Sequence, residues 1–386
     1  MRVVEQCHWR PDTGWGFDDA EIDADWVLLF GTAGALCDAS VCSALWSRYP
    51  QALCVGCSTA GEIHDVCVYD DTLVATAVKF DATELRGHQV AIPEATKSRE
   101  VGEQLASALK DQDLSHILVL SDGLKVNGTE LVAGLTSDLP EDVTVTGGLA
   151  GDGEGLGRTF VLYRTPDVEN AEPSVAAEGV VVAVGFYGER LRVGCGSMGG
   201  WDPFGPERKI TRSEGNVLYE LDGQSALTLY KKFLGEKAAE LPTSALLFPL
   251  SLRSPDGSSS GIVRTVLAVD EEDRSMTFAG DVGQGWYAQL MKANFERLID
   301  GALGAAKISL GDKEEALELA LLVSCVGRKL VLKQRIEEEV EAVREVLGPK
   351  PALTGFYSLG EISPFSVSER CELHNQTMTI TTFREI

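Results

Sequence analysis

Two stretches of the chain share the pattern Gly-x-x-[Ser/Thr]-x-Gly-Glu-Ile, at residues 56–63 and 355–362. Each stretch carries a hydroxyl side chain three residues before its glutamate, which is Glu62 in the first and Glu361 in the second. The glutamate carboxylate could bind the ammonium group of a small zwitterionic ligand. Free backbone amides or an arginine could then bind the carboxylate of that ligand. The same pattern could instead form a tight turn in which the glutamate caps a neighbouring backbone. Both interpretations stay open from the sequence.

An internal repeat adds a third acidic loop. Residues 26–62 and 116–152 align without gaps, and the alignment places Glu62 on Asp152. Residues 319–361 form a third, longer copy that ends at the second glutamate. Because repeated segments fold into repeated units, each copy is expected to contain a strand, a helix, a second strand and a Gly-rich acidic loop.

The predicted strands are continuous apolar runs, for example at 26–30 and 319–323. Such runs are typical of a sheet that is covered on both faces. The expected fold is therefore α/β, with two related halves and mixed, largely parallel sheets built from repeated βαβ units. The chain is expected to divide into a lead-in at 1–25, an N-terminal domain at 26–218 and a C-terminal domain at 219–386.

Helix signals accompany these strands. Asp38 and Thr129 are predicted to cap the helices of the first and second copies. The apolar spacing at 284–303 predicts a further helix, and the acidic run at 337–339 is interpreted as the solvated face of the helix in the third copy.

In a right-handed βαβ unit both strands end at the same edge of the sheet, so the loops that follow them become neighbours. Open α/β sheets bind ligands at this edge, because helix N-termini and free amides face it. The residues expected to bind a ligand are Thr32, Cys57, Ser58, Thr59, Glu62, Asp122, Asp152, Ser324, Cys325, Arg328, Tyr357, Ser358, Glu361, His374 and Asn375.

Composition narrows the range of partners. The formal net charge is −25, which disfavours nucleic acid and anionic lipid surfaces. No apolar run approaches the ~20 residues of a spanning helix, and no signal peptide opens the chain, so a cytoplasmic location without membrane insertion is expected. No P-loop or nucleophile-elbow motif is present.

The nine cysteines are expected to be free thiols, without a zinc site. Cys57 and Cys325 could act as nucleophiles, which keeps a cysteine-dependent enzyme as an alternative function.

Together these motifs resemble the hallmarks of FIST proteins. They include Ser121-Asp-Gly123, Gly147-Gly-Leu-Ala-Gly-Asp152, Leu221-Asp-Gly-Gln-Ser-Ala226, Ser324-Cys-Val-Gly-Arg328 and His374-Asn-Gln-Thr-Met378, beside the two glutamate loops. The resemblance covers nearly the whole chain, with the C-terminal FIST domain beginning near Tyr219. It implies a non-enzymatic sensory module of bacterial signal transduction that binds a small ligand, such as an amino acid or a related carboxylate.

The resemblance also implies a partner and an alternative ligand. No kinase or cyclase segment fits in the remaining residues, so the signal is expected to pass through a separate partner such as a histidine kinase. Some family members sense nitric oxide through haem held by a histidine, and here His64 and His374 are the candidates for that role. Apart from this alternative, no cofactor and no metal are expected.

Overall fold

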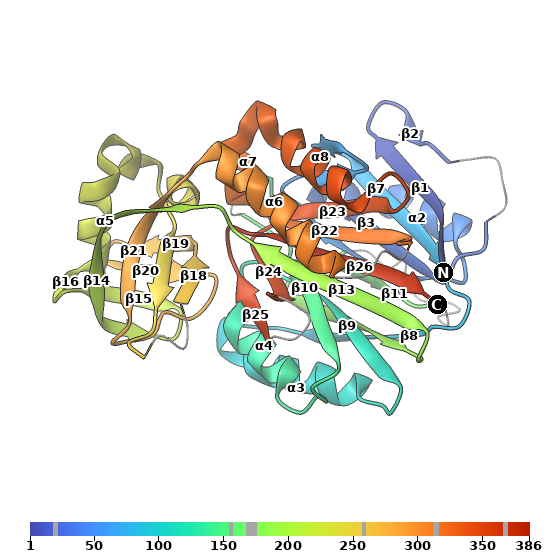
Figure 1. Ribbon diagram of the computed structural model, residues 1–386, viewed down its shortest axis with the longest axis horizontal. Helices are drawn as coiled ribbons and strands as arrows, with labels where there is room; N and C mark the ends of the chain where they lie inside the picture. Colours follow the sequence, from blue (N-terminus) through green and yellow to red (C-terminus); the bar gives the residue numbers. More distant parts are fainter. Residues whose placement is uncertain (18–21, 154–156, 167–175, 257–259, 312–315, 366–369) are drawn as a thin grey trace.

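The strands of the chain form four sheets in the residues that the structure describes. The structure is a computed structural model, and it describes residues 1–17, 22–153, 157–166, 176–256, 260–311, 316–365 and 370–386. Three of the sheets have six strands each and make up one body, which holds both ends of the chain (Figure 1). The fourth, eight-stranded sheet forms a lobe at one side of this body (Figure 1).

The first sheet of the body contains the first repeated segment. Its strands, in order across the sheet, are β11 (Val161–Arg164), β4 (Leu53–Ser58), β3 (Trp26–Gly31), β7 (Leu73–Lys79), β1 (Arg2–Arg10) and β2 (Gly14–Trp15). β3 and β4 run parallel, and α1 (Ala33–Leu36) and α2 (Ala39–Arg48) connect them. Asp38 caps α2 as predicted, because its carboxylate accepts a hydrogen bond from the backbone N–H of Ser40 at 2.8 Å.

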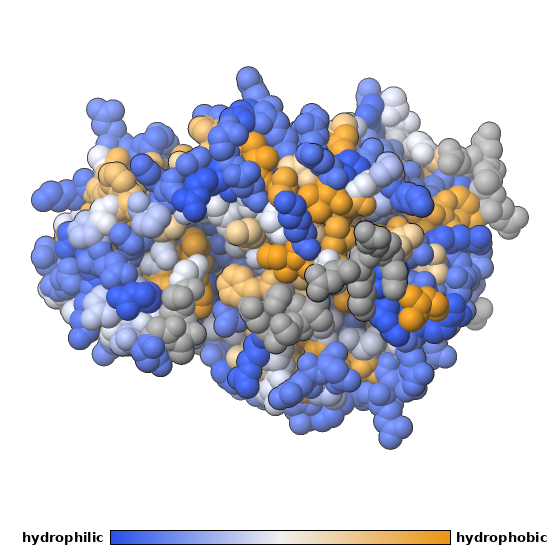
Figure 2. Space-filling model, viewed as in Figure 1, coloured by the Kyte–Doolittle hydropathy of each residue, from blue (hydrophilic) through white to orange (hydrophobic). Residues whose placement is uncertain are grey.

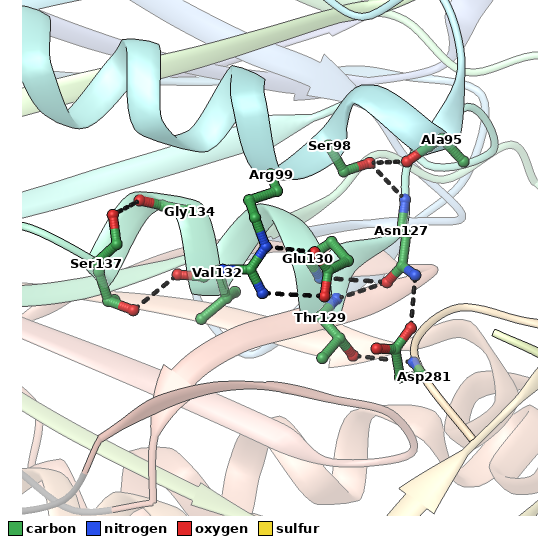
Figure 3. A network of polar contacts seen from close by, with 11 residues as sticks. Ala95, Ser98, Arg99, Asn127, Thr129, Glu130, Val132, Gly134, Ser137 and Asp281 are labelled. Atoms are coloured by element: carbon green, nitrogen blue, oxygen red, sulfur yellow. Dashed lines mark hydrogen bonds and ion pairs between the residues drawn. The ribbon is translucent and has the colours of Figure 1, made fainter. Parts of the chain in front are cut away.

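The second sheet contains the second repeated segment. Its strands are β25 (Cys371–His374), β24 (Gly360–Pro364), β10 (Thr144–Leu149), β9 (Leu114–Ser121), β12 (Val180–Tyr187) and β8 (Glu84–Ala91). α4 (Gly128–Thr136) connects the parallel strands β9 and β10 and packs against α3 (Ser98–Leu109), which follows η1 (Ala95–Lys97). The predicted cap at Thr129 is wrong, because the side chain of Asn127 accepts the N–H groups of Thr129 and Glu130 (Figure 3).

The third sheet contains the third repeated segment. Its strands are β13 (Leu191–Met198), β26 (Met378–Glu385), β22 (Leu319–Cys325), β23 (Ala352–Ser358), β5 (Glu62–His64) and β6 (Cys67–Tyr69). α7 (Val326–Leu332), η4 (Lys333–Arg335) and α8 (Ile336–Leu347) connect the parallel strands β22 and β23. α6 (Phe295–Leu310) packs against α8 and β13. Figure 2 shows hydrophobic residues gathered around α6, near the middle of this face of the molecule.

The three sheets exchange strands with one another. β5 follows β4 along the chain but pairs with β23, and β24 follows β23 but pairs with β10. β11 follows β10 but pairs with β4. Each acidic loop is therefore the place where the chain leaves one sheet and enters the next.

The sheets are mixed rather than largely parallel, which corrects the expectation from the sequence. Among the described strand pairs, β3–β4, β9–β10 and β22–β23 are parallel and the others are antiparallel. An antiparallel strand lies on each side of every parallel pair. The apolar runs indicated burial of both faces correctly, but burial does not specify the direction of the neighbouring strand.

The body has its core where the inner faces of the three sheets meet. Trp26, Leu28 and Phe30 of β3 belong to one buried cluster with residues of the other two sheets, including Phe186 and Phe383. The alternate residues of β3, Val27 and Leu29, pack against α1 and α2 instead. Both faces of the strand are thus covered, which explains its continuous apolar sequence.

The lobe is antiparallel throughout its described strands. They are β14 (Asp202–Glu214), β15 (Val217–Leu221), β16 (Gln224–Ser225), β17 (Leu250–Arg253), β18 (Ser260–Arg264), β19 (Val266–Asp270), β20 (Ser275–Phe278) and β21 (Tyr287–Lys292). Its helices are α5 (Ala226–Leu234), η2 (Gly235–Glu240) and η3 (Thr243–Leu247). The predicted domain boundary between residues 218 and 219 falls inside β15.

The helix predicted at 284–303 is wrong in its first half. Trp286 and Leu290 have helical spacing, but residues 287–292 form β21, held between β14 and β17 by ladders of hydrogen bonds. The helix α6 begins only after Asn294, whose side chain accepts the N–H of Arg297.

Candidate functional site

The three acidic loops lie against one another, and residues 57–62, 148–152 and 357–361 are called the junction below. Backbone hydrogen bonds join each loop to the next, from Ala60 N–H to the Tyr357 carbonyl (2.9 Å), from Leu359 N–H to Leu149 (3.2 Å) and from Gly151 N–H to Ser58 (2.8 Å). The repeat predicted that the two loops within each copy would be neighbours. The structure instead brings the acidic loops of all three copies together.

The junction is closely packed around Gly151. A Cβ atom added there would lie 2.6 Å from the backbone nitrogen of Ala60 and 2.8 Å from the carbonyl oxygen of Tyr357. Both contacts are with backbone atoms, which cannot rotate away as a side chain could. A ligand could therefore enter the centre of the junction only if the loops moved apart.

Glu62 lies in this packed region, with only 1% of its surface exposed. The hydroxyl groups of Thr59 and Thr72 donate to its two carboxylate oxygens at 2.5 and 2.8 Å. Burial raises the pKa of Glu62 from 4.5 to about 7, although both hydroxyl donors act in the opposite direction. Glu62 therefore changes its charge near neutral pH.

Glu361 has the same surroundings in the third copy. Ser358 donates its hydroxyl to one oxygen at 2.6 Å, and Thr377 donates its N–H (3.1 Å) and its hydroxyl (2.9 Å) to the other. Burial raises the pKa of Glu361 to about 7. The hydroxyl three residues before each glutamate thus has a defined role, because it hydrogen-bonds that glutamate.

Asp152, the third acid, has a different role. It is half-buried, and its carboxylate accepts the backbone N–H groups of Gly157 and Arg158, both at 2.9 Å. The hydroxyl position of the other two copies is occupied here by Leu149. The repeat therefore preserves the place of the acid but not its environment.

Arg328 forms a fully buried ion pair with Glu339 of α8. Its Nη2 and Nε lie 2.7 and 3.0 Å from one Glu339 oxygen, and both side chains have no exposed surface. The other Glu339 oxygen accepts the hydroxyl groups of Tyr357 (2.7 Å) and Ser324 (3.1 Å). The interpretation of residue 339 as solvated is wrong. Arg328, predicted to bind a ligand carboxylate, already has a carboxylate partner within the protein.

Of the remaining predicted residues of the first copy, Ser58 hydrogen-bonds within the protein. The Ser58 hydroxyl donates to the carbonyl of Gly151 at 2.7 Å and accepts the N–H of Phe160 at 2.9 Å. Thr32 lies at the N-cap of α1, where its side chain makes no capping hydrogen bond. In the second copy, Asp122 closes a turn by accepting backbone N–H groups, including that of Gly179 at 2.8 Å.

Cys57 and Cys325 are both completely buried. Burial raises the pKa of each thiol above its ordinary value. A cysteine nucleophile requires the opposite shift, because the thiolate is the reactive form. In the part of the chain that the structure describes, no three His, Cys, Asp or Glu side chains are grouped so that they could hold a metal ion.

His374 and Asn375 lie at the contact between the body and the lobe. The Asn375 side chain donates to the carbonyl of Leu359 in the junction and accepts the N–H of Thr265 in the lobe, both at 3.2 Å. A second contact joins Asp281 of the lobe to Asn127 and Thr129 at the N-terminus of α4, at 2.6 and 3.0 Å (Figure 3). Asn375 therefore connects the junction directly to the lobe.

Lys329 of α7 contacts the junction and was not predicted from the sequence. Its Nζ donates to the carbonyl of Ala60 at 2.7 Å and forms an ion pair with Asp70, whose side chain is 64% exposed. This lysine comes from the third copy but covers the loop of the first, and its charge lowers the pKa of Glu62. The signal in the sequence that could have identified Lys329 is its position directly after Arg328.

The two candidate haem ligands both contact other groups of the protein. His374 is buried, one of its ring nitrogens lies 2.8 Å from the carbonyl oxygen of Ser363, and its ring packs edge-on against Phe365. His64 lies on the short strand β5, with its ring against His8 and Tyr69. The His374 ring is thus enclosed by protein groups, whereas His64 is half-buried.

Comparison with protein families identifies the chain. The FIST N domain model matches residues 25–224 and the FIST C domain model matches residues 226–364. The chain therefore belongs to the FIST family, whose domains are associated with sensory and signal-transduction proteins.

The chain is also similar to Uncharacterized protein MJ1623 of Methanocaldococcus jannaschii, with 21% identity over 340 residues. The match covers 82% of this chain but 62% of that protein, so the chain spans less than two thirds of its relative. Of the helices in the described residues, none has the length and apolar character needed to cross a membrane.

Proposed function

We propose that this chain is a sensory protein that binds a small ligand bearing a carboxylate and passes the binding event to a separate partner protein. Amino acids are the first candidates for the ligand, and a histidine kinase is the first candidate for the partner. Membership of the FIST family supports the sensory role.

The proposed site is the rim of the junction, beside Lys329. The observation that carries this proposal is the contact of Lys329 with the carbonyl of Ala60, above the buried carboxyl of Glu62. An amino acid could replace the exposed ion pair between Lys329 and Asp70, with its carboxylate on Lys329 and its ammonium group on Asp70.

The rim is also well placed to transmit a signal. Movement of the loops would alter the hydrogen bond from Asn375 to Leu359, and Asn375 also holds the lobe through Thr265. Ligand binding at the rim could thus change how the lobe lies on the body, and a partner protein could detect that change.

Thermal unfolding with a library of amino acids and organic acids tests the proposal. A ligand at 100 times its Kd should stabilise the protein by about 2.7 kcal/mol. Lys329→Gln should abolish the shift, whereas Lys350→Gln, at an exposed lysine away from the junction, should preserve it. Absence of any shift across the library would contradict the proposed ligand class, and an unchanged shift in Lys329→Gln would contradict the site.

The two alternative functions are a haem-binding nitric-oxide sensor and a cysteine-dependent enzyme, and no comparable contact among the described residues supports either of them. The haem alternative needs an accessible histidine, and the cysteine-dependent enzyme needs an accessible thiol of low pKa. Because Cys57 and Cys325 are buried, we expect slow alkylation of both at pH 6, which mass spectrometry measures.

A further inference from the structure

The lobe contains an open pocket that lies apart from the junction. The pocket has a volume of about 390 Å³ and lies between α5 and the strands β14, β15, β17 and β21. Its wall includes Leu221, Tyr230, Leu250 and Ala288, which are all nearly fully buried. The hydroxyl of Tyr230 donates to the carbonyl of Phe248 at 2.8 Å, so its polar atom already has a partner. The volume falls in the range of small-ligand pockets.

Two aromatic rings are exposed at the mouth of this pocket. Phe204 is 44% exposed and Phe233 is 36% exposed, and their rings meet edge to face with centroids 5.3 Å apart. Isolated exposed apolar residues are common, but two aromatic rings that flank a concave apolar wall are typical of a binding site.

β14 is irregular where it lines this side of the pocket. The pairing of β14 with β21 is interrupted between Phe204 and Arg208. Gly205 in the interrupted segment has a φ of +73°, and its carbonyl accepts the side-chain N–H of Gln289 at 2.7 Å. Bulges of this kind redirect side chains near functional sites. Here the bulge separates Phe204 from Arg208, which both line the pocket.

The charged groups around the pocket are mainly cationic, although the chain as a whole has a charge of −25. Arg208 and Lys232 line it, and Lys292 lies 5.8 Å from the centre of the Phe204 ring. Arg208 uses Nη1 in an exposed ion pair with Asp222 at 3.0 Å, which leaves its other N–H groups for a ligand. Within the described residues, Lys232 makes no ion pair. The other lining side chains are apolar or aromatic.

We infer that this pocket binds a small amphipathic anion, that is, a molecule with an apolar body and one terminal carboxylate. The apolar wall and the two phenylalanine rings would hold the body, and Lys232 with Arg208 would hold the carboxylate at the rim. This site does not depend on the proposed function, because it shares no residue with the junction.

A head-group comparison tests the inference by calorimetric titration with decanoate, decanol and decylamine. The intact protein should bind decanoate saturably in a 1:1 ratio, and it should bind decanol and decylamine at least fivefold more weakly. Absence of saturable decanoate binding would overturn the inference, as would equal affinity for decanol.

Neighbouring lysines on α5 provide a matched pair of variants. Lys232→Gln should weaken decanoate binding roughly five- to tenfold and leave decanol binding unchanged, since only the charge contact is lost. Lys231→Gln is the control, because Lys231 does not line the pocket and forms an ion pair with Glu271. Equal losses in both variants would show a general charge effect and overturn the site.

A third variant tests the location without changing charge. Leu229→Trp adds bulk to the wall and should abolish decanoate binding while the thermal transition shows that the protein is still folded. A folded Leu229→Trp protein with unchanged affinity would overturn the inference. Lys329→Gln should leave decanoate binding unchanged, which separates this site from the one proposed at the junction.

Discussion

The junction of the body and the pocket of the lobe differ in whether their polar groups are buried or exposed. At the junction, backbone segments approach so closely that a Cβ at Gly151 has no room, and the carboxyls of Glu62 and Glu361 are buried among protein donors. At the pocket, two phenylalanine rings are exposed and Lys232 lies at the rim. The acidic loops of the three repeated segments hold three sheets together, whereas the open space lies in the lobe, outside those repeated segments.

The buried ion pair beside the junction should give the largest effect on stability. Glu339→Gln leaves the charge of Arg328 buried without its partner, so the free energy of unfolding should fall by about 3–5 kcal/mol. Urea unfolding measures this loss. The double variant Arg328→Met, Glu339→Leu should recover much of it, because both charges are removed. A loss below 1 kcal/mol in Glu339→Gln would show that the region is less tightly closed than its geometry indicates.

The close packing at Gly151 should give the next largest effect. Gly151→Ala forces apart the backbone at Ala60 and Tyr357, so we expect a loss of about 2–3 kcal/mol in urea unfolding. Gly34→Ala is the control, because its added Cβ would have no heavy atom within 4 Å and alanine favours the helix there. An equally stable Gly151→Ala protein would contradict the described packing of the three loops.

The sequence predicted part of this junction and missed the rest for a physical reason. The motif around Glu62 and Glu361 identified two equivalent carboxyls, and the internal repeat identified a third acid at Asp152. Their meeting at one point depends on β5 and β24, strands of three and five residues that pair with a different sheet. Such short strands carry no pattern that specifies a distant partner.

The helical spacing of the apolar residues in α8 could have predicted that Glu339 is buried. Glu339 lies three and four residues before Ala342 and Val343, which are both buried on α8. This spacing places its side chain on the buried face, opposite to the solvated face that the acidic run suggested. The lobe pocket was not predicted, because apolar residues from five different elements form it.

The carboxyl of Glu361 should make stability depend on pH in a measurable way. Its pKa is about 7 in the folded protein and near 4.5 in the unfolded chain, so the folded state holds this proton more tightly. The stabilisation from this group is complete below about pH 4.5 and is lost as the pH rises through 7. A shift of this size corresponds to about 3 kcal/mol in total.

Glu361→Gln tests this dependence, because glutamine resembles the protonated carboxyl and does not titrate. The decrease in unfolding free energy between pH 5 and pH 8 should be smaller in this variant than in the unmodified protein by roughly 2 kcal/mol. The difference between the two proteins removes the contribution of other titrating groups. Glu345→Gln, at an exposed position of α8, is the control. Parallel pH profiles for all three proteins would contradict the shifted pKa.

The smallest effect is expected at the mouth of the lobe pocket. Phe233 exposes 36% of its surface, so Phe233→Ala removes less buried area than at a core ring and should cost about 1–2 kcal/mol in urea unfolding. The matched control is Phe356→Ala in the body, where the fully buried ring stacks on Phe30 with centroids 4.7 Å apart and a loss of about 3–5 kcal/mol is expected. If the two losses were equal, Phe233 would be part of the core of the lobe and not a free wall of its pocket. If Phe233→Ala is stable and also binds decanoate more weakly, the exposed ring serves the ligand, and the contrast between a closed junction and an open pocket is sharpened.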